Sequence, residues 1–282
     1  MKLLFASLFG LIVVLFVGCS SVKSTDLINF VLPAGGYDKK TLSYGNLPRQ
    51  SLDLYTPKSK QSKKPILFVY GGAWRDGDKQ DFEFVAHALT GLGHTVIIPE
   101  YRRYPEVQFP LFVNDIADSI RYMEHQALTV LGEPLDEVIL MGHSAGAHTV
   151  ALLTTDESYL KSRGIKTKIS GLIAMSGPYD LDLKDPEVEP VFKNTTAKKT
   201  NPILNIRSDM SPVLLLHGAA DKRVGPFNTE RFASALSKSG VSVTTHIYPD
   251  VDHTKIIGSL AAPLRFLSDS YSDIKDFLVQ IK

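Results

Sequence analysis

The strongest chemical signal in the sequence is the run Gly142-His143-Ser144-Ala145-Gly146, which has the form G-x-S-x-G. An apolar run at 138–141 precedes it and a helical pattern follows, which predicts a sharp turn from a strand into a helix. Such a turn strains the backbone of the serine and exposes its hydroxyl, and flanking glycines avoid steric clashes. We therefore predict that Ser144 is a nucleophile. The N–H of Ala145, at the start of the helix, is then expected to stabilise an oxyanion.

A second glycine-containing run, Tyr70-Gly71-Gly72-Ala73-Trp74, directly follows a predicted strand. Consecutive glycines at such a place allow backbone amides to turn toward a site, as in the glycine-rich loop of esterases. We predict that the N–H groups of Gly72 and Ala73 complete the oxyanion hole. An ordinary Gly-Gly turn is the alternative for this run taken alone. Trp74 either lines the substrate pocket or packs in the core, and the sequence leaves both open.

An acid and a histidine should follow the nucleophile in that order along the chain. Asp221 lies directly after the predicted strand 213–217, and His253 lies on the loop after the last predicted strand. Asp250 and Asp252 are rival acids, but their closeness to His253 in the chain does not supply the opposed geometry that an orienting carboxylate needs. His253 is expected to accept the serine proton while the acid fixes its tautomer and stabilises its charged form. The predicted triad is Ser144, Asp221 and His253.

Other histidines surround this predicted site. His143 adjoins Ser144 and His148 lies one helical turn beyond it, so both are expected to line the substrate pocket without acting as the base. His217 ends a predicted strand and is expected to support Asp221.

Short apolar or β-branched runs alternate with amphipathic helical patterns through most of the chain. The predicted strands cover residues 51–55, 66–70, 95–99, 137–141, 171–175, 213–217 and 241–248. The predicted helices lie near 82–92, after 110, after 144, at 226–238 and at the end of the chain. Several strands are apolar without alternation, as in a parallel sheet that is covered on both faces. The pattern predicts an α/β fold, a doubly wound and mostly parallel sheet with its ligand at the carboxyl ends of the strands.

One segment, 178–212, breaks the alternation with prolines, mixed charges and little periodicity. Long irregular connections in compact domains are usually functional or flexible. We interpret it as a small cap over the site, with a solvated excursion as the alternative. We expect one catalytic domain over 37–282.

The composition is that of an ordinary globular protein, with 44% hydrophobic and 22% charged residues. A formal net charge of +1 gives no basic footprint for nucleic acid. The expected partner is a small-molecule ester substrate. No cofactor and no metal ion are expected, and the oligomeric state stays open.

The first residues of the chain differ from the rest. Lys2 precedes an almost uncharged apolar run at 3–17, which is followed by small residues. This arrangement is typical of a secretory signal. A transmembrane anchor is the alternative, but about 20 apolar residues are needed to span a bilayer and this run is shorter.

The end of this run, Phe16-Val17-Gly18-Cys19, resembles the lipobox of bacterial lipoproteins, with Phe16 where leucine is usual. Cleavage before such a cysteine is coupled to its diacylation, and Cys19 is the only cysteine in the chain. We predict a signal peptide at 1–18, a tether and N-terminal segment at 19–36, and lipidation of Cys19. The protein is then exported and anchored to a membrane, in the outer membrane or at the cell surface.

Five stretches in order carry a family resemblance: GGAW at 71–74, PEYRRYPEVQFP at 99–110, GHSAG at 142–146, HGAADKRV at 217–224 and DVDH at 250–253. This order resembles the carboxylesterase and hormone-sensitive-lipase-like branch of the α/β-hydrolases. It is particularly similar to the feruloyl-esterase-like and kynurenine-formamidase-like group, over about residues 40–280. One departure is Tyr70, where that group usually has a histidine that is commonly structural.

The resemblance implies an α/β-hydrolase fold and hydrolysis of carboxylic esters of small or aromatic substrates through an acyl-enzyme on Ser144. Cleavage of amides or formamides, as by arylformamidases, is the enzymatic alternative. A catalytically silent surface protein that binds through its cleft is the alternative of another class. An intact nucleophile, acid and base argue against it, because binding requires none of them to be reactive.

Overall fold

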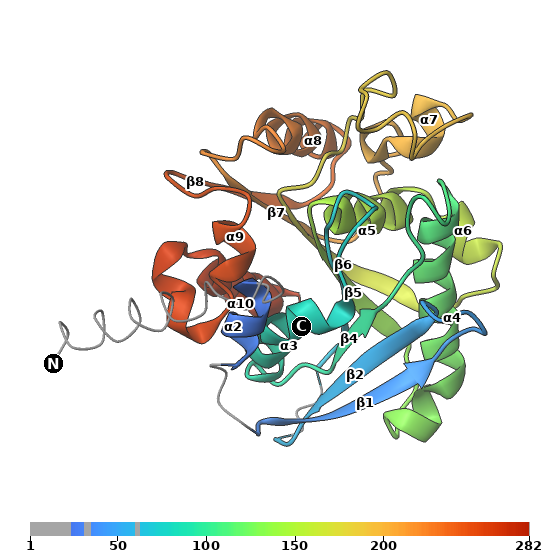
Figure 1. Cartoon of the computed structure of the whole chain (residues 1–282), viewed down its shortest axis with the longest axis vertical. Helices are drawn as coiled ribbons and strands as arrows, with labels where there is room; N and C mark the ends of the chain where they lie inside the picture. Colours follow the sequence, from blue (N-terminus) through green and yellow to red (C-terminus); the bar gives the residue numbers. More distant parts are fainter. Residues whose placement is uncertain (1–23, 31–34, 60–62, 282) are drawn as a thin grey trace, which may run out of the picture.

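The computed structural model describes residues 24–30, 35–59 and 63–281. Within these residues eight strands form one sheet in the order β1-β2-β4-β3-β5-β6-β7-β8 (Figure 1). The strands are β1 (Tyr37–Ser43), β2 (Ser51–Pro57), β3 (Ile66–Val69), β4 (Val96–Pro99), β5 (Glu137–His143), β6 (Lys168–Met175), β7 (Val213–Gly218) and β8 (Val243–Tyr248). Strands β3 to β8 pair in parallel, whereas β2 runs antiparallel to both of its neighbours.

Helices cover both faces of this sheet, with α3 and α10 on one side and α4, α5 and α8 on the other (Figure 1). The helices are α2 (Ser24–Phe30), α3 (Glu83–Thr90), α4 (Leu111–Val130), α5 (Ala145–Thr155), α6 (Ser158–Lys161), α7 (Ala197–Thr200), α8 (Phe227–Lys238), α9 (Lys255–Gly258) and α10 (Ser270–Gln280). Short 3₁₀ helices are η1 (Lys79–Phe82), η2 (Pro202–Leu204) and η3 (Ala262–Leu267). The doubly wound α/β-hydrolase fold expected from the sequence is confirmed.

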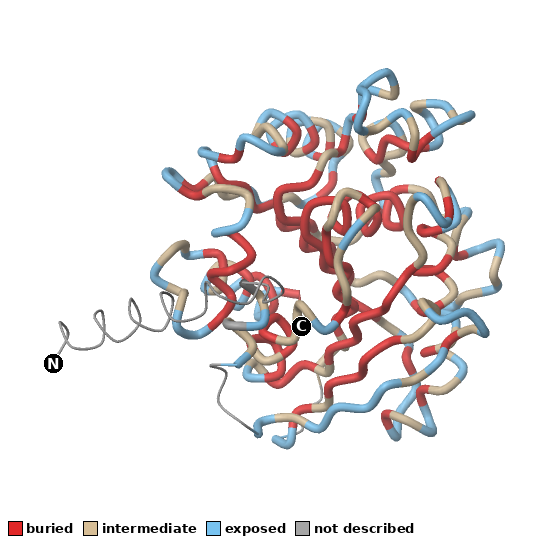
Figure 2. The backbone as a smooth tube through the Cα atoms, in the orientation of Figure 1, coloured by how far each residue is buried: buried red, intermediate tan, exposed pale blue. Residues whose placement is uncertain are grey.

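The central strands are apolar, and both of their faces are buried. Every residue of β3, β4 and β7 is buried, and the red core of Figure 2 runs through them. This explains why these runs read as continuous hydrophobic stretches rather than as an alternation.

The strand β1 was not predicted from the sequence, and its position explains why. It lies at the edge of the sheet, and four consecutive residues of it are exposed. Lys39 and Lys40 stand in this strand, where charged side chains discourage pairing with another chain. A polar edge strand therefore lacks the apolar signal on which the sequence prediction depended.

The N-terminal segment 19–36 contains a helix, α2, that the sequence analysis did not predict. The Asn29 side chain ties this helix to the domain: it donates to the Gln80 carbonyl oxygen at 2.9 Å and accepts from the Phe84 N–H at 3.0 Å. The predicted signal peptide and Cys19 lie outside the described residues. Among the described helices, none is long and apolar enough to cross a membrane.

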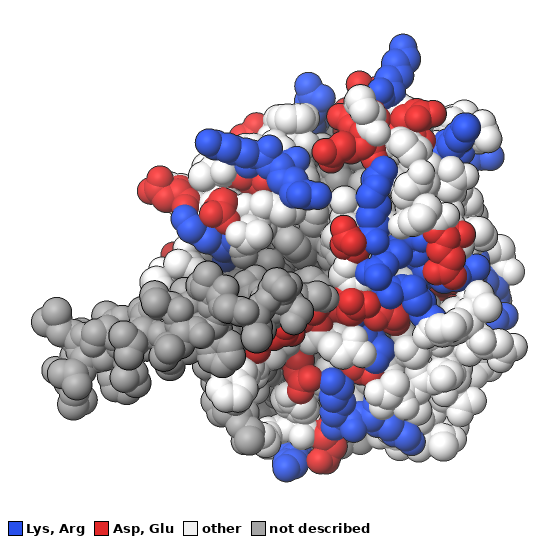
Figure 3. Space-filling model, in the orientation of Figure 1, with Lys and Arg blue, Asp and Glu red and all other residues white. Residues whose placement is uncertain are grey.

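The segment 178–212 contains α7 and η2 and is held to the domain by hydrogen bonds to its backbone. Its carbonyl oxygens accept hydrogen bonds from the side chains of Arg75, Gln108 and His148, at 2.7 to 2.8 Å. It therefore lies against the glycine-rich loop and α5; its role as a cap stays a prediction. On the face of the molecule seen in Figure 3, Lys and Arg side chains are interspersed with Asp and Glu over the described residues.

Candidate active site

The turn between β5 and α5 places Ser144 in the left-handed half of backbone space, with φ 56° and ψ −124°. The glycines around it allow this turn to pack against β3. A Cβ atom on Gly146 would stand 2.0 Å from the Val69 carbonyl oxygen, and one on Gly142 would stand 2.6 Å from the Gly146 carbonyl. Both distances lie below any van der Waals contact, so only glycine fits. The two glycines of the G-x-S-x-G pattern are therefore required by packing.

The structure brings the three predicted triad residues into one hydrogen-bonded chain. The Ser144 Oγ lies 2.9 Å from His253 Nε2, and His253 Nδ1 lies 2.7 Å from Asp221 Oδ2. Because Nδ1–H donates to the carboxylate, Nε2 is left to accept the serine proton. Ser144, at the end of β5, meets two loops that follow β7 and β8, since parallel strands end at the same edge of the sheet.

The carboxylate of Asp221 is buried and heavily hydrogen-bonded. Its Oδ1 accepts the backbone N–H groups of Arg223 and Val224, both at 2.9 Å, and Oδ2 lies 3.3 Å from His217 Nε2. Burial alone would raise the pKa of Asp221, but the hydrogen bonds from His217, His253 and the backbone outweigh burial and hold that pKa well below its usual range. The carboxylate is therefore ionised at neutral pH, and His217 stands beside it as the sequence suggested.

The rival acids have other partners. Asp252 Oδ1 accepts the N–H groups of Thr254 and Lys255 at 3.0 and 2.8 Å, which caps the start of α9. Asp250 has a positive φ of 58°, and its carbonyl oxygen accepts the Lys255 ammonium at 3.2 Å. Neither carboxylate makes a hydrogen bond to His253, whose Nδ1 is engaged by Asp221.

The loop after β3 approaches the nucleophile closely, since a Cβ on Gly71 would stand 2.8 Å from the Ser144 Cβ. Three successive residues of this loop have positive φ: Gly72 at 127°, Ala73 at 52° and Trp74 at 58°. The N–H groups of Gly72 and Ala73 donate no hydrogen bond to any described residue, nor does that of Ala145. Free amides at a strained loop and at a helix N-terminus can receive a developing negative charge.

The predicted pocket residues are all buried, and they differ in place. His143 lies against the base: its Nε2–H donates to the His253 carbonyl oxygen at 2.9 Å, and the two rings are 4.8 Å apart. Burial, and then the neighbouring His253, lower the pKa of His143 to about 3. His143 is therefore neutral at physiological pH and holds the backbone of the histidine loop.

Trp74 and His148 pack against each other. Their rings stand edge to face at 5.3 Å, and Phe192 packs edge to face against both. His148 Nε2–H donates to the Thr200 carbonyl oxygen at 2.8 Å, and burial lowers the pKa of His148 to about 4. These two side chains join the glycine-rich loop, α5 and the 178–212 segment. Contact of either side chain with substrate stays a prediction.

A polar group behind the glycine-rich loop was missed from the sequence. Arg49, Tyr70 and Glu100 hydrogen-bond to one another there, although the three lie far apart in the chain. The sequence signal that could have found this group is Glu100, which directly follows the apolar and fully buried strand β4. A charge in such a place requires a buried partner.

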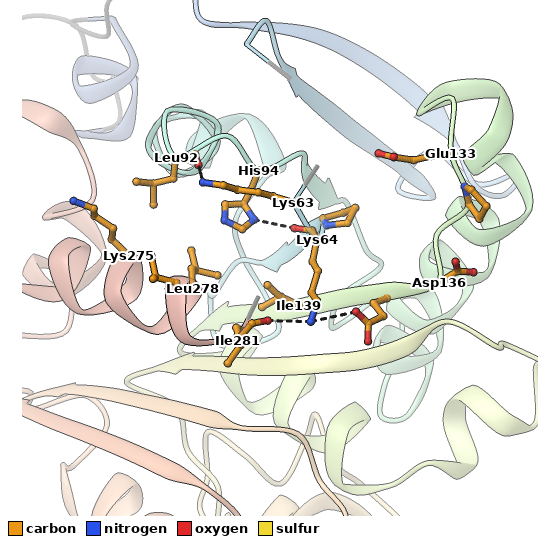
Figure 4. Close-up of a pocket in the computed structure, with 14 residues that line it drawn as sticks. Lys63, Lys64, Leu92, His94, Glu133, Asp136, Ile139, Lys275, Leu278 and Ile281 are labelled. Carbon is orange, nitrogen blue, oxygen red and sulfur yellow. Dashed lines mark hydrogen bonds and ion pairs between the residues drawn. The ribbon is translucent and has the colours of Figure 1, made fainter. Parts of the chain in front are cut away.

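A cavity of about 640 Å³ lies at the amino ends of β3 and β5, whereas the triad lies at the carboxyl ends of the strands (Figure 4). Leu92, His94, Ile139 and Leu278 are among its lining residues, and none of the triad residues is. Lys64 crosses it, pairing with Glu137 and with the Ile281 carbonyl oxygen. The cavity is therefore separate from the candidate site. In the described part of the chain, no cluster of three or more His, Cys, Asp and Glu side chains could hold a metal ion.

Comparison with solved structures shows the same fold in known esterases. A truncated carbohydrate esterase from gut microbiota matches with a TM-score of 0.74 at 20% identity, covering 88% of this chain and 98% of that one. An inhibited esterase B from Lactobacillus rhamnosis matches with a TM-score of 0.77 at 19% identity, covering 91% of each chain. The chain therefore has the α/β-hydrolase fold.

Residues 52–236 match the BD-FAE family, and the chain belongs to it. A related isoprenylcysteine alpha-carbonyl methylesterase of Arabidopsis thaliana is 28% identical over 260 residues, covering 83% of this chain and 60% of the relative. A kynurenine formamidase of Danio rerio is 27% identical over 229 residues, covering 77% and 75%. The chain spans about 60% of the length of the methylesterase relatives.

The buried His148 predicts a loss of stability in acid. Its pKa is about 4 in the folded chain and near 6.5 when unfolded, so the unfolded chain binds the proton first as pH falls. The contribution of neutral His148 to the free energy of unfolding is therefore complete above pH 6.5 and is lost progressively as the pH falls toward 4. Between pH 7.5 and 4.5, His148→Gln should lose about 2 to 3 kcal/mol less unfolding free energy than the wild type.

Urea unfolding at the two pH values measures this difference. His125→Gln, at an exposed histidine of α4, supplies the matched control, and it should reduce the acid loss less than His148→Gln does. An equal acid loss in wild type and His148→Gln would contradict the assignment.

Proposed function

We propose that this protein is a serine carboxylesterase that forms an acyl-enzyme on Ser144. The observation that carries the proposal is the chain of contacts from Ser144 Oγ through His253 to Asp221, at 2.9 and 2.7 Å. The free amides of Gly72, Ala73 and Ala145 beside this serine support it. The methylesterase relatives and esterase-like folds agree with ester hydrolysis.

In the proposed first step, Ser144 Oγ attacks the ester carbonyl carbon while its proton passes to His253 Nε2. The carbonyl oxygen takes up the negative charge and accepts hydrogen bonds from the free amides. When the tetrahedral intermediate collapses, the bond to the leaving alcohol breaks, and the alcohol oxygen takes the proton from His253. Ionised Asp221 stabilises the imidazolium throughout.

In the second step a water molecule gives a proton to His253 and attacks the acyl carbon. The bond to Ser144 then breaks, the serine recovers its proton and the carboxylic acid leaves. Esters of small or aromatic substrates are the proposed class, since Trp74 of the glycine-rich loop and Phe192 place aromatic rings beside the candidate site. No cofactor enters either step.

Formamide cleavage is the second candidate, and the kynurenine formamidase relatives favour it. The same nucleophile, base and amides would serve, with an amine as the leaving group. Turnover compared on p-nitrophenyl, feruloyl, acetylated-sugar and formyl-anilide substrates separates the two.

Ser144→Ala should abolish ester turnover, with a loss on the order of 10⁴-fold or more, because the nucleophile is removed. The fold should persist, since the Ser144 hydroxyl bonds only to His253 among the described residues. A fluorophosphonate probe should label the wild type at Ser144 and leave the variant unlabelled. Ser170→Ala, at the amino end of β6, is the control and should stay active. Labelling elsewhere, or an active Ser144→Ala, would sink the nucleophile assignment.

Asp221→Asn should lower kcat by roughly 10⁴-fold near neutral pH, because an amide favours the wrong imidazole tautomer. Asp250→Asn and Asp252→Asn should change kcat little, since neither side chain bonds to the imidazole. The three variants are compared for kcat on one good ester, with folding checked by circular dichroism. A crippled Asp252→Asn beside an active Asp221→Asn would show that the acid is misassigned.

We further propose that the mature chain starts at a lipidated Cys19, on the lipobox-like ending and the single cysteine of the sequence. Mass spectrometry of the native N-terminus should find diacylation at Cys19. Cys19→Ser should release the protein from the membrane fraction. An unmodified Cys19 or a different cleavage site refutes this proposal.

A further inference from the structure

Arg49 lies in the connection between β1 and β2, behind the glycine-rich loop at 71–76, which we call the oxyanion loop. Its Nη2 donates to the Gly77 carbonyl oxygen at 2.9 Å and its Nε donates to the Tyr101 carbonyl oxygen at 2.8 Å. Nη1 pairs with Asp78 at 3.1 Å. One half-buried guanidinium therefore fastens both the far end of the loop and the segment that follows β4.

The same guanidinium reaches the start of the loop through a buried carboxylate and a phenol. Arg49 Nη2 donates to the Tyr70 hydroxyl at 3.2 Å and pairs with Glu100, and the Tyr70 hydroxyl donates to Glu100. Burial raises the pKa of Tyr70 well above its usual range, so the hydroxyl keeps its proton. Glu100 Oε2 also accepts the Lys79 N–H at 3.1 Å.

Tyr70 and Gly77 bracket the loop that carries the free amides. Between them the backbone lies outside helix and strand, and three successive residues have positive φ, a costly conformation for Ala73 and Trp74. Such a loop keeps its shape only if its surroundings hold it. The Tyr70 ring is held by stacking on Tyr101 and Phe82, at 4.7 and 5.3 Å, and the Gly77 carbonyl oxygen accepts a second hydrogen bond from Arg103.

We propose that Arg49 is a positioning residue of the oxyanion hole, which fixes the Gly72 and Ala73 amides against Ser144 by tying Tyr70, Glu100 and Gly77 together. The inference rests on the proposed esterase function. Arg49 touches neither Ser144 nor His253, so its effect is exerted through the loop. Tyr70 supplies the link between the loop and the carboxylate of Glu100.

Lysine cannot replace Arg49 here. The planar guanidinium presents donors in a fixed fork, which matches two carbonyl oxygens, a hydroxyl and two carboxylates at once. A single ammonium keeps the charge opposite Glu100 but leaves some of these acceptors unpaired. Arg49→Lys thus separates positioning from charge compensation, whereas Arg49→Ala removes both.

The test measures kcat, KM and the inhibition constant of an alkyl boronic acid, which forms a tetrahedral adduct on the serine. Arg49→Lys should lower kcat by roughly 10- to 100-fold, because misplaced amides stabilise the transition state poorly. KM should change little, and the boronate should bind more weakly in proportion to kcat. Guanidinium ion at low concentration should restore kcat to Arg49→Ala, and ammonium ion should not.

Arg163→Lys is the matched control, since Arg163 is equally half-buried and donates to Asp118 and to the Tyr159 carbonyl oxygen, between α4 and α6. It should leave kcat and boronate binding unchanged. If both Arg49 variants fail to fold, Tyr70→Phe takes their place, because it removes only the linking hydroxyl; it should lower kcat at constant KM.

Wild-type kcat in a folded Arg49→Lys or Tyr70→Phe, or a kcat loss without weaker boronate binding, would overturn the inference. A wild-type protein without ester or formamide turnover would instead refute the proposed function. The two failures are therefore distinct.

Discussion

The contact between the nucleophile turn and the end of β3 is the constraint on which the site depends. Gly146 lies so close to the Val69 carbonyl oxygen that no Cβ fits between them, and a Cβ on Gly71 would stand 2.8 Å from the Ser144 Cβ. This approach is possible because β3 and β5 are parallel neighbours whose carboxyl ends meet. It brings the glycine-rich loop beside Ser144 and the start of α5, where the free amides of both are proposed to receive one oxygen.

Buried charged side chains inside the domain are paired with side chains of opposite charge. Asp115 receives a bidentate contact from Arg102, and Asp53 pairs with Lys79 at 2.6 Å. Desolvation lowers the pKa of His143 and of His148 and so holds both side chains neutral at physiological pH. His253, with 12% of its side chain exposed, retains contact with both a carboxylate and the nucleophile. Of the histidines near Ser144, it alone has both contacts that a base requires.

The family match and the site do not coincide along the chain. The matched stretch, 52–236, contains Ser144, Asp221 and the oxyanion loop, but His253 lies beyond it and Arg49 lies before it. His253 and Arg49 thus come from the parts of the chain that flank the matched stretch. Within the match, the Tyr70 phenol donates a hydrogen bond to Glu100.

The sequence by itself determined the fold class. It also predicted Ser144 as the nucleophile and Asp221 and His253 as its partners, three residues that the structure brings together. These depend on local signals: apolar runs that mark buried strands, glycines that mark a tight turn, and polar residues at strand ends. Strand β1 escaped because an exposed edge strand carries no apolar pattern. Tertiary structure alone decided that Arg49 meets Glu100 across 51 residues, that His143 holds the His253 loop, and that Trp74 and His148 pack against each other. Hydrogen-bond partners far apart in the chain are chosen by packing, and no local periodicity records them.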